Sequence, residues 1–213
     1  MSFVLSGNSA PRRELLEPDN YVARCYSMII LGTTYNEMFN TSSTKVLIQW
    51  ELPDCLIEVE RDGVKKMLPR AQSATYTLSL NEKATLRKVL ESWRGKAFTV
   101  EELEGFDISK VVGAPCLLNV IQAENKKGEL FNKISTVSKL PRGLACPAQV
   151  NPTVLFDITD PAQDLAEMEK LPEWIRETIK KSDEYRARTT ASNEVTEYDD
   201  EGVAYPSDQD LPF

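Results

Sequence analysis

An aromatic residue and a cation alternate in the segment "GELFNKISTV", which has the pattern of a β-strand. Alternation puts Phe131 and Lys133 on one face of this strand and Leu130, Asn132 and Ile134 on the other. Lys126 and Lys127 precede the strand at an expected turn. An exposed ring stacks on an unpaired base and lysines neutralise phosphates, so this pattern favours contact with single-stranded nucleic acid. The alternative is a core phenylalanine beside solvated turn lysines.

Weaker candidates for the same chemistry lie on the preceding strands. Lys45 alternates with Val46, whose face we expect in the core, so Lys45 faces the expected groove and Trp50 does not. Arg70 and Tyr76 flank the expected third strand. Trp93 falls on the apolar stripe of a predicted helix and is expected in the core.

The end of the sequence, "SDQDLPF", combines carboxylates with a large apolar side chain. Such a segment offers a partner protein a ring for an apolar pocket and acids for a basic rim, and proline lowers the entropy lost on docking. The predicted partner-binding residues are Asp208, Asp210, Leu211, Pro212 and Phe213. The alternative is an acidic segment that only improves solubility.

The net charge of −8 is concentrated in one segment. Residues 189–213 hold seven acidic side chains and no Lys or Arg, whereas residues 1–188 hold 25 basic and 26 acidic ones. The folded part is therefore nearly neutral and has room for a local basic surface, while the acidity belongs to the tail.

The residue types argue against most catalytic chemistry. Histidine is absent, which excludes Ser-His-Asp and Cys-His systems and histidine-ligated zinc. No GxxxxGK[ST] phosphate loop is present. Asp54 with Glu124 and Lys126 imitates the acidic set of metal-dependent nucleases, but Glu124 falls at a hairpin turn and the spacing is long. We expect no enzyme activity, no cofactor and no metal, with a nuclease as a distant alternative.

The segments that position these residues have mainly the sequence pattern of β-strands. The expected order is "YVARCYSMIILGTT", "TKVLIQWEL", a hairpin with Asp62-Gly63 at its turn, and "ATYTLSL". Ser79 and Glu82 have capping-box spacing before the helical pattern "NEKATLRKVLESW", which Gly95 ends. A short acidic helix, "TVEELEG", and two strands around an Asn-Lys-Lys-Gly turn follow.

Three strands, a helix and two further strands form the order of the OB-fold, a five-stranded Greek-key barrel. We therefore predict such a barrel over residues 1–141, with a β-sandwich as the alternative. Residues 142–188 are expected to form an extended segment and one amphipathic helix over 172–186, with Trp174, Ile175, Ile179 and Tyr185 as its apolar stripe. Residues 189–213 are expected to be disordered.

Cysteine usage and the absence of apolar runs indicate a compartment. No run of eighteen apolar residues and no signal-peptide pattern occur, and the four cysteines form no CxxC pair. We expect a cytoplasmic protein with reduced thiols.

Two parts of the sequence resemble a known group of proteins. "DQDLPF" resembles the C-terminal tip of bacterial and phage single-stranded DNA-binding proteins, where it recruits replication and repair proteins. "LRKVLESWRGKAFTVEELEGFDISKVVGAPCLLNV", "GELFNKISTVSKLPRG" and "LPEWIRETIKKSDEY" are similar to phage-encoded proteins of the OB-fold type. The cellular members have a longer Gly/Gln-rich linker before the tip, so their tetrameric assembly is not implied.

Together these patterns predict a non-enzymatic, largely sequence-independent single-stranded DNA-binding protein, encoded by a phage. Its tail is expected to recruit replication, recombination and repair proteins, and a bacterial host cytoplasm is the expected compartment. The alternative is a protein-interaction adaptor of a phage replication complex that binds no nucleic acid.

Overall fold

The computed structural model describes residues 14–37, 40–61 and 63–196. The chain divides into two units. The first contains the residues up to Ile29 and Val46–Leu155, and the second contains Ile30–Lys45 and the residues from Phe156 onward. Each unit is described separately below. Within the described residues, no helix combines the length and the apolar character that a membrane crossing requires.

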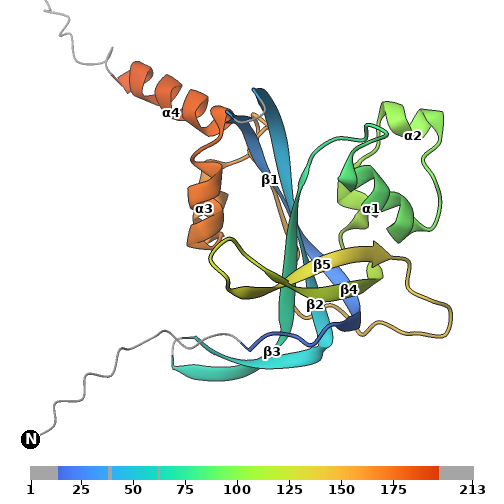
Figure 1. Ribbon diagram of the computed structural model, residues 1–213. Coiled ribbons are helices and arrows are strands. Elements are labelled where there is room, and N and C mark those ends of the chain that lie inside the picture. The colour runs from blue at the N-terminus through green and yellow to red at the C-terminus, as the bar shows by residue number, and fades with distance from the viewer. Residues whose placement is uncertain (1–13, 38–39, 62, 197–213) are drawn as a thin grey trace, which may run out of the picture. The chain divides into compact units, whose positions relative to one another are not determined.

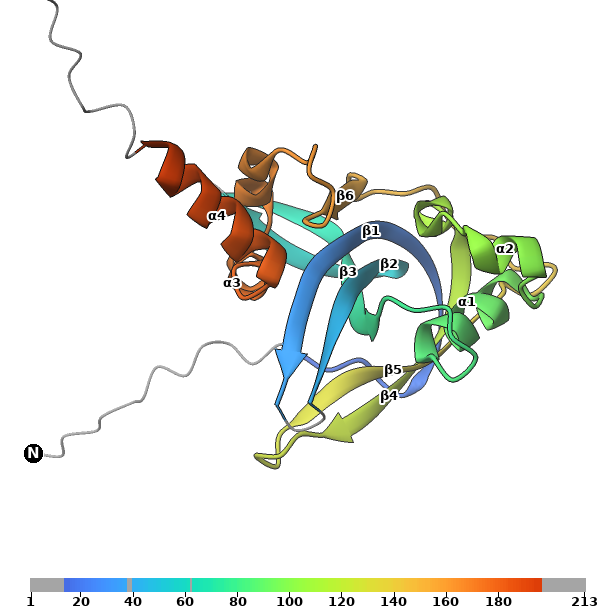
Figure 2. The same ribbon diagram turned by 90° about the horizontal axis from the view of Figure 1, so that it is seen from above.

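A curled sheet forms the first unit (Figures 1 and 2). The strands of the sheet are β1 (Asp19–Asn36), β2 (Thr41–Arg61), β3 (Val64–Thr77), β4 (Pro115–Glu124) and β5 (Leu130–Ser138), in the order β3-β2-β1-β4-β5. The residues of β1 after Ile29 and those of β2 before Val46 belong to the second unit. β4 is antiparallel to both β1 and β5. The outermost strands β3 and β5 approach within 8 Å between Cα atoms, which shows how far the sheet curls. The prediction of a mainly β protein is confirmed.

The expected separate hairpin around Gly63 is not an insertion. Its arms are the ends of β2 and β3, which are long continuous strands, and Gly63 has a φ of 75°. The turn predicted at Asn125–Gly128 is present, with the Gly128 N–H donating to the Asn125 carbonyl over 3.0 Å. The alternation of residue types predicted which segments form strands, but it did not predict the length of each strand.

Two α-helices lie between β3 and β4, and both were predicted: α1 (Thr85–Arg94) and α2 (Val100–Glu104). The 3₁₀ helix η1 (Ile108–Val111), which was not predicted, follows them. Gly95 ends α1 with a φ of 69°, as expected. The predicted capping box at Ser79 is wrong, because the N-cap is Ala84 and no side chain caps α1. A capping box is instead present at Thr99 and Glu102, at the start of α2.

Buried side chains on the inner face of the sheet form the core of this unit together with α1. Ala23, Leu118 and Val120 are fully buried there. Trp50 is also fully buried, and its ring lies 5.7 Å from that of Trp93 on α1, between ring centroids. The expectation that both tryptophans belong to the core is confirmed.

The opposite face of β1 and β2 is covered by an extended strap, residues 141–153. Arg24 on β1 donates to the carbonyls of Cys146 and Pro147 at 3.0–3.2 Å. Glu51 on β2 is fully buried, and its carboxylate accepts from the Val150 N–H at 2.9 Å and the Asn151 N–H at 2.8 Å. These charge-assisted bonds hold the strap on the sheet.

The second unit contains the end of β6 (Val154–Asp157), the 3₁₀ helix η2 (Leu165–Lys170), α3 (Glu173–Ile179) and α4 (Asp183–Thr196). β6 pairs with β1. The core of this unit includes Phe156, Ile158 and Met168. Gly32 has a φ of 88°, and a Cβ at that position would lie 2.5 Å from the Ser182 Cβ. Glycine is therefore required where β1 approaches the start of α4.

The single helix predicted over 172–186 is wrong, because the chain forms two helices there. α3 ends at Ile179, and the Ser182 hydroxyl accepts the Tyr185 N–H over 3.2 Å at the start of α4. Ile175 and Ile179 are buried as predicted, whereas Trp174 is 53% exposed and does not belong to the apolar stripe. α4 extends to Thr196, so the prediction of disorder over residues 189–213 is wrong for residues 189–196.

Candidate nucleic-acid interface

The register of β1, β4 and β5 sorts the hairpin side chains into two faces. Phe131 pairs with Ala123, and Lys133 pairs with Ile121, which puts all four side chains on one face. Farther along, Asn119 pairs with Thr136 after an irregularity in the register between Asn119 and Val120. We call this face of β4 and β5 the outer face. Both strands are fully described, and none of their side chains on this face is a carboxylate.

The inner side of the same hairpin is held by the segment before β1. Asn132 Oδ1 accepts from the Leu16 N–H at 2.8 Å, and Asn132 Nδ2 donates to the Leu16 carbonyl at 2.9 Å. Gln122 Nε2 donates to the same carbonyl at 3.0 Å. Because Asn132 points inward to make these bonds, its neighbours Phe131 and Lys133 point outward.

Both sides of the hairpin are exposed near its turn, where Leu130 on the inner side is 50% exposed. On the outer face, Phe131 is 41% exposed and Ile121 is 36% exposed, while Ile134 on the inner side is half-buried. Lys133, Lys126 and Lys127 are exposed, and the described residues provide none of them with an ion-pair partner. An uncovered ring and an adjacent unpaired ammonium group are the two components that contact with a base and its phosphate requires.

The turn that carries the two lysines is itself well defined. Asn125 Oδ1 accepts the Lys127 N–H at 2.8 Å and the Glu129 N–H at 3.0 Å, and Gly128 has a φ of 79°. The side chain of Asn125 therefore satisfies backbone donors of the turn, and the lysine side chains are left to project from it.

Arg70 and Tyr76 lie on a different face from the exposed side chains of β3. The even-numbered residues of β3 from Arg70 to Tyr76 are half-buried, whereas Ala71, Ser73 and Thr75 are exposed. Burial raises the pKa of the Tyr76 hydroxyl to about 12, and the nearby Cys116 contributes to the shift. Tyr76 thus resembles a structural residue more than a stacking platform. Lys45 is half-buried and belongs to the second unit.

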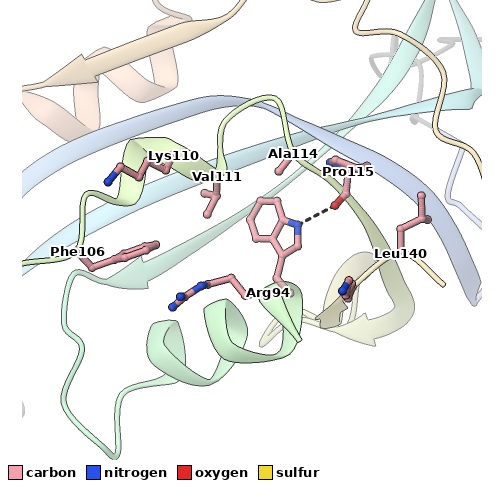
Figure 3. Close-up of a pocket in the computed structure, with 9 residues that line it drawn as sticks. Arg94, Phe106, Lys110, Val111, Ala114, Pro115 and Leu140 are labelled. Carbon is pink, nitrogen blue, oxygen red and sulfur yellow. Dashed lines mark hydrogen bonds between the residues drawn. The ribbon is translucent and has the colours of Figure 1, made fainter. Parts of the chain in front are cut away.

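A cavity of about 420 Å³ lies beside α1, and sequence reasoning did not predict it. Figure 3 shows Arg94, Phe106 and Lys110 around one part of it and Pro115 and Leu140 around another. The full lining is Trp93, Arg94, Phe106, Lys110, Val111, Ala114, Pro115, Lys139 and Leu140. Trp93 is fixed in the wall, because its Nε1 donates to the Pro115 carbonyl at 2.9 Å. The cavity therefore has apolar walls and three cations.

The three cations are not equivalent. The Arg94 guanidinium lies over the rings of Phe98 and Phe106, 4.4 and 4.9 Å from their centroids, and forms an ion pair with Glu102. The Thr99 backbone N–H, together with Lys96 and Arg94, lowers the pKa of Glu102 to about 2. Lys110 and Lys139 are exposed, and neither forms an ion pair with a described carboxylate.

A signal for the missed cations was present in the sequence. Residues 130–144 contain Lys133, Lys139 and Arg142 and no acidic residue, in a chain where acids outnumber bases. Phe106 and Lys110 carry no comparable signal, because only the fold brings the segment after α2 to the end of β5.

The predicted partner-binding residues lie outside the described residues: Asp208, Asp210, Leu211, Pro212 and Phe213. Among the described residues, no group of three or more side chains is arranged to hold a metal ion. No protein-family model matches the chain, and a search of curated proteins finds no match.

Proposed function

We propose that this protein is a non-enzymatic, largely sequence-independent single-stranded DNA-binding protein. The observation that carries the proposal is the outer face of β4 and β5, where Phe131 is 41% exposed beside an unpaired Lys133 and no carboxylate shares the face. The exposed ring and the neighbouring lysine together offer the stacking and phosphate contacts that a single-stranded nucleic acid requires.

The strand order supports an OB-fold-like barrel as the framework. The order β3-β2-β1-β4-β5, the approach of β3 to β5 and the helix α1 between β3 and β4 are the features of that topology. In OB-folds the loop between strands four and five contacts oligonucleotides, and here that loop carries Lys126 and Lys127. The resemblance to phage-encoded proteins of this type supports the same assignment.

The chemistry of binding follows from the residue types. One base of an extended strand stacks on Phe131, while Lys133, Lys126 and Lys127 neutralise neighbouring phosphates. Every base has a π-face and every nucleotide a phosphate, so such contacts do not read sequence. In duplex DNA the bases are stacked on one another and cannot reach the ring, so single strands are preferred.

We also propose that residues 208–213 recruit replication and recombination proteins. The support is their composition alone: two carboxylates followed by Leu211, Pro212 and Phe213. A partner with an apolar pocket and a basic rim fits this chemistry.

A protein-interaction adaptor is the second candidate. It is favoured by Trp174, which is 53% exposed on α3 in the second unit, since an exposed tryptophan is a common interface anchor. The two candidates differ in whether the first unit binds nucleic acid.

Fluorescence anisotropy with labelled oligo-dT and with duplex DNA of equal length separates them. The proposal expects tighter binding to oligo-dT, weakening as salt rises. Equal binding to both forms, or no binding to either at low salt, contradicts it and favours the adaptor.

A further inference from the structure

We propose that the cavity beside α1 is a second contact site for the same single strand, which takes a nucleotide several positions away from the one on Phe131. This inference rests on the proposed function and adds a binding site to it. The site consists of Lys110, Lys139 and Arg94 around the apolar walls formed by Phe106, Trp93 and Leu140.

The first argument is the composition of the cavity. Its volume of about 420 Å³ lies within the range of small-ligand sites, and its lining combines apolar walls with cations. The lining contains no acidic residue. A nucleotide combines a flat, largely apolar base with a phosphate. It therefore fits this lining, with the base against the apolar walls and the phosphate at Lys110 and Lys139.

The second argument is the fixed position of Arg94, one of the residues that line the cavity. Nη1 of Arg94 is buried and has no hydrogen-bond partner among the described residues. The side chain is held in place by the two rings and by Glu102. Nη1 itself is covered, so Arg94 contributes a fixed positive charge to the cavity rather than a hydrogen bond from this atom.

The third argument is continuity along β5. The β4–β5 turn and α1 lie at opposite ends of this strand (Figure 1). Lys133, Ser135, Thr136 and Lys139 are exposed between them, and residues 130–144 contain no acid. Phe131 and Lys139 are separated along the strand by roughly 25 Å. An extended single strand of DNA that starts on the hairpin therefore meets no fixed negative charge from β5 on its way to the cavity.

A length series tests this site. Binding of oligo-dT of about 4 and about 16 nucleotides, the limits of typical site sizes for one OB-fold, is compared among full-length proteins. They are the unaltered chain, the double variant Lys110→Ala/Lys139→Ala, and Lys88→Ala. Lys88 is an exposed residue of α1 that does not line the cavity, so it is the matched control.

We expect the double variant to weaken binding of the long oligonucleotide about tenfold at low salt, because two phosphate contacts are lost. Binding of the short one, which the hairpin holds, should change little, and Lys88→Ala should affect neither. Circular dichroism checks that the variants fold. An oligonucleotide with 5-iodouracil at successive positions should also cross-link to residues 106–115 or 139–140 as well as to the hairpin.

Two failures are distinguishable. If the unaltered chain binds neither oligonucleotide, the proposed function itself is wrong. If it binds both but the double variant has the affinity of the unaltered chain for the long one, and cross-links map to the hairpin alone, the second contact site is refuted. An acidic peptide from a partner protein is then the remaining occupant for the cavity.

Discussion

At the scale of single residues, Phe131 decides whether the outer face is a binding surface. Phe131→Ala should reduce affinity for oligo-dT by about 1–3 kcal/mol, because the stacking ring is lost. The thermal unfolding temperature should barely change, since the ring is 41% exposed. Leu130→Ala is the matched control, because Leu130 is 50% exposed on the same strand and points to the other face. Lost stability with unchanged affinity would show that Phe131 is a packing residue.

Sequence reasoning placed Phe131 and Lys133 on one face and Ile134 on the other because strand side chains alternate, and the register agrees. It also selected Tyr76, which is half-buried, because alternation shows that residues share a face but not which face is covered. The curl of the sheet decides that, and it arises from contacts between strands far apart in the chain. The cations of the cavity were missed for the same reason.

At the scale of elements, the strap over β1 and β2 depends on one buried carboxylate. Glu51→Ala should destabilise the first unit by on the order of 3 kcal/mol, because the Val150 and Asn151 N–H groups lose a charged acceptor. Limited proteolysis should then cut within residues 141–153 in the variant first. Unchanged stability and a resistant strap would mean that Glu51 does not hold this segment.

The start of α2 makes a prediction about pH. Glu102 has a pKa of about 2 in the folded protein against an ordinary value of 4.5, so its ionised form favours folding. This stability is fully present above pH 4.5 and is lost as the pH falls from 4.5 toward 2. The unfolding temperatures of the unaltered chain and Glu102→Gln should differ at pH 6 and converge toward pH 2. A constant difference across this range would contradict the role assigned to the carboxylate.

Elements were predictable where one residue type controls the backbone. Gly95 ends α1 and Gly128 completes the β4–β5 turn, because both have positive φ values that glycine adopts without strain. Capping was less predictable. Ser79 has the right spacing to Glu82, but its hydroxyl accepts the Asn81 N–H over 3.1 Å in a turn, so it does not cap the helix. Ser182, followed by Asp183 and Glu184, carried the signal for the break between α3 and α4.

At the scale of the whole molecule, the acidic residues in 189–213 are expected to compete with DNA for the lysines of the β4–β5 hairpin. They belong to the same chain, so their effective concentration at these lysines is high. Replacing the seven acids by Asn or Gln in the full chain should therefore strengthen oligo-dT binding, most at low salt where screening is weak. Phe213→Ala should leave that affinity unchanged but reduce recovery of partner proteins from host extract. Equal DNA affinity in all these proteins would refute the competition.

The salt dependence of oligo-dT binding tests most directly whether the β4–β5 hairpin binds nucleic acid. The logarithm of the binding constant is measured against the logarithm of salt concentration for the unaltered chain and for Lys126→Ala/Lys127→Ala/Lys133→Ala. Each lysine that neutralises a phosphate contributes about 0.7 to the slope, so the triple variant should bind more weakly with a slope shallower by about 2. Identical slopes and affinities in the two proteins, both folded, would contradict the assignment of this face as the nucleic-acid interface.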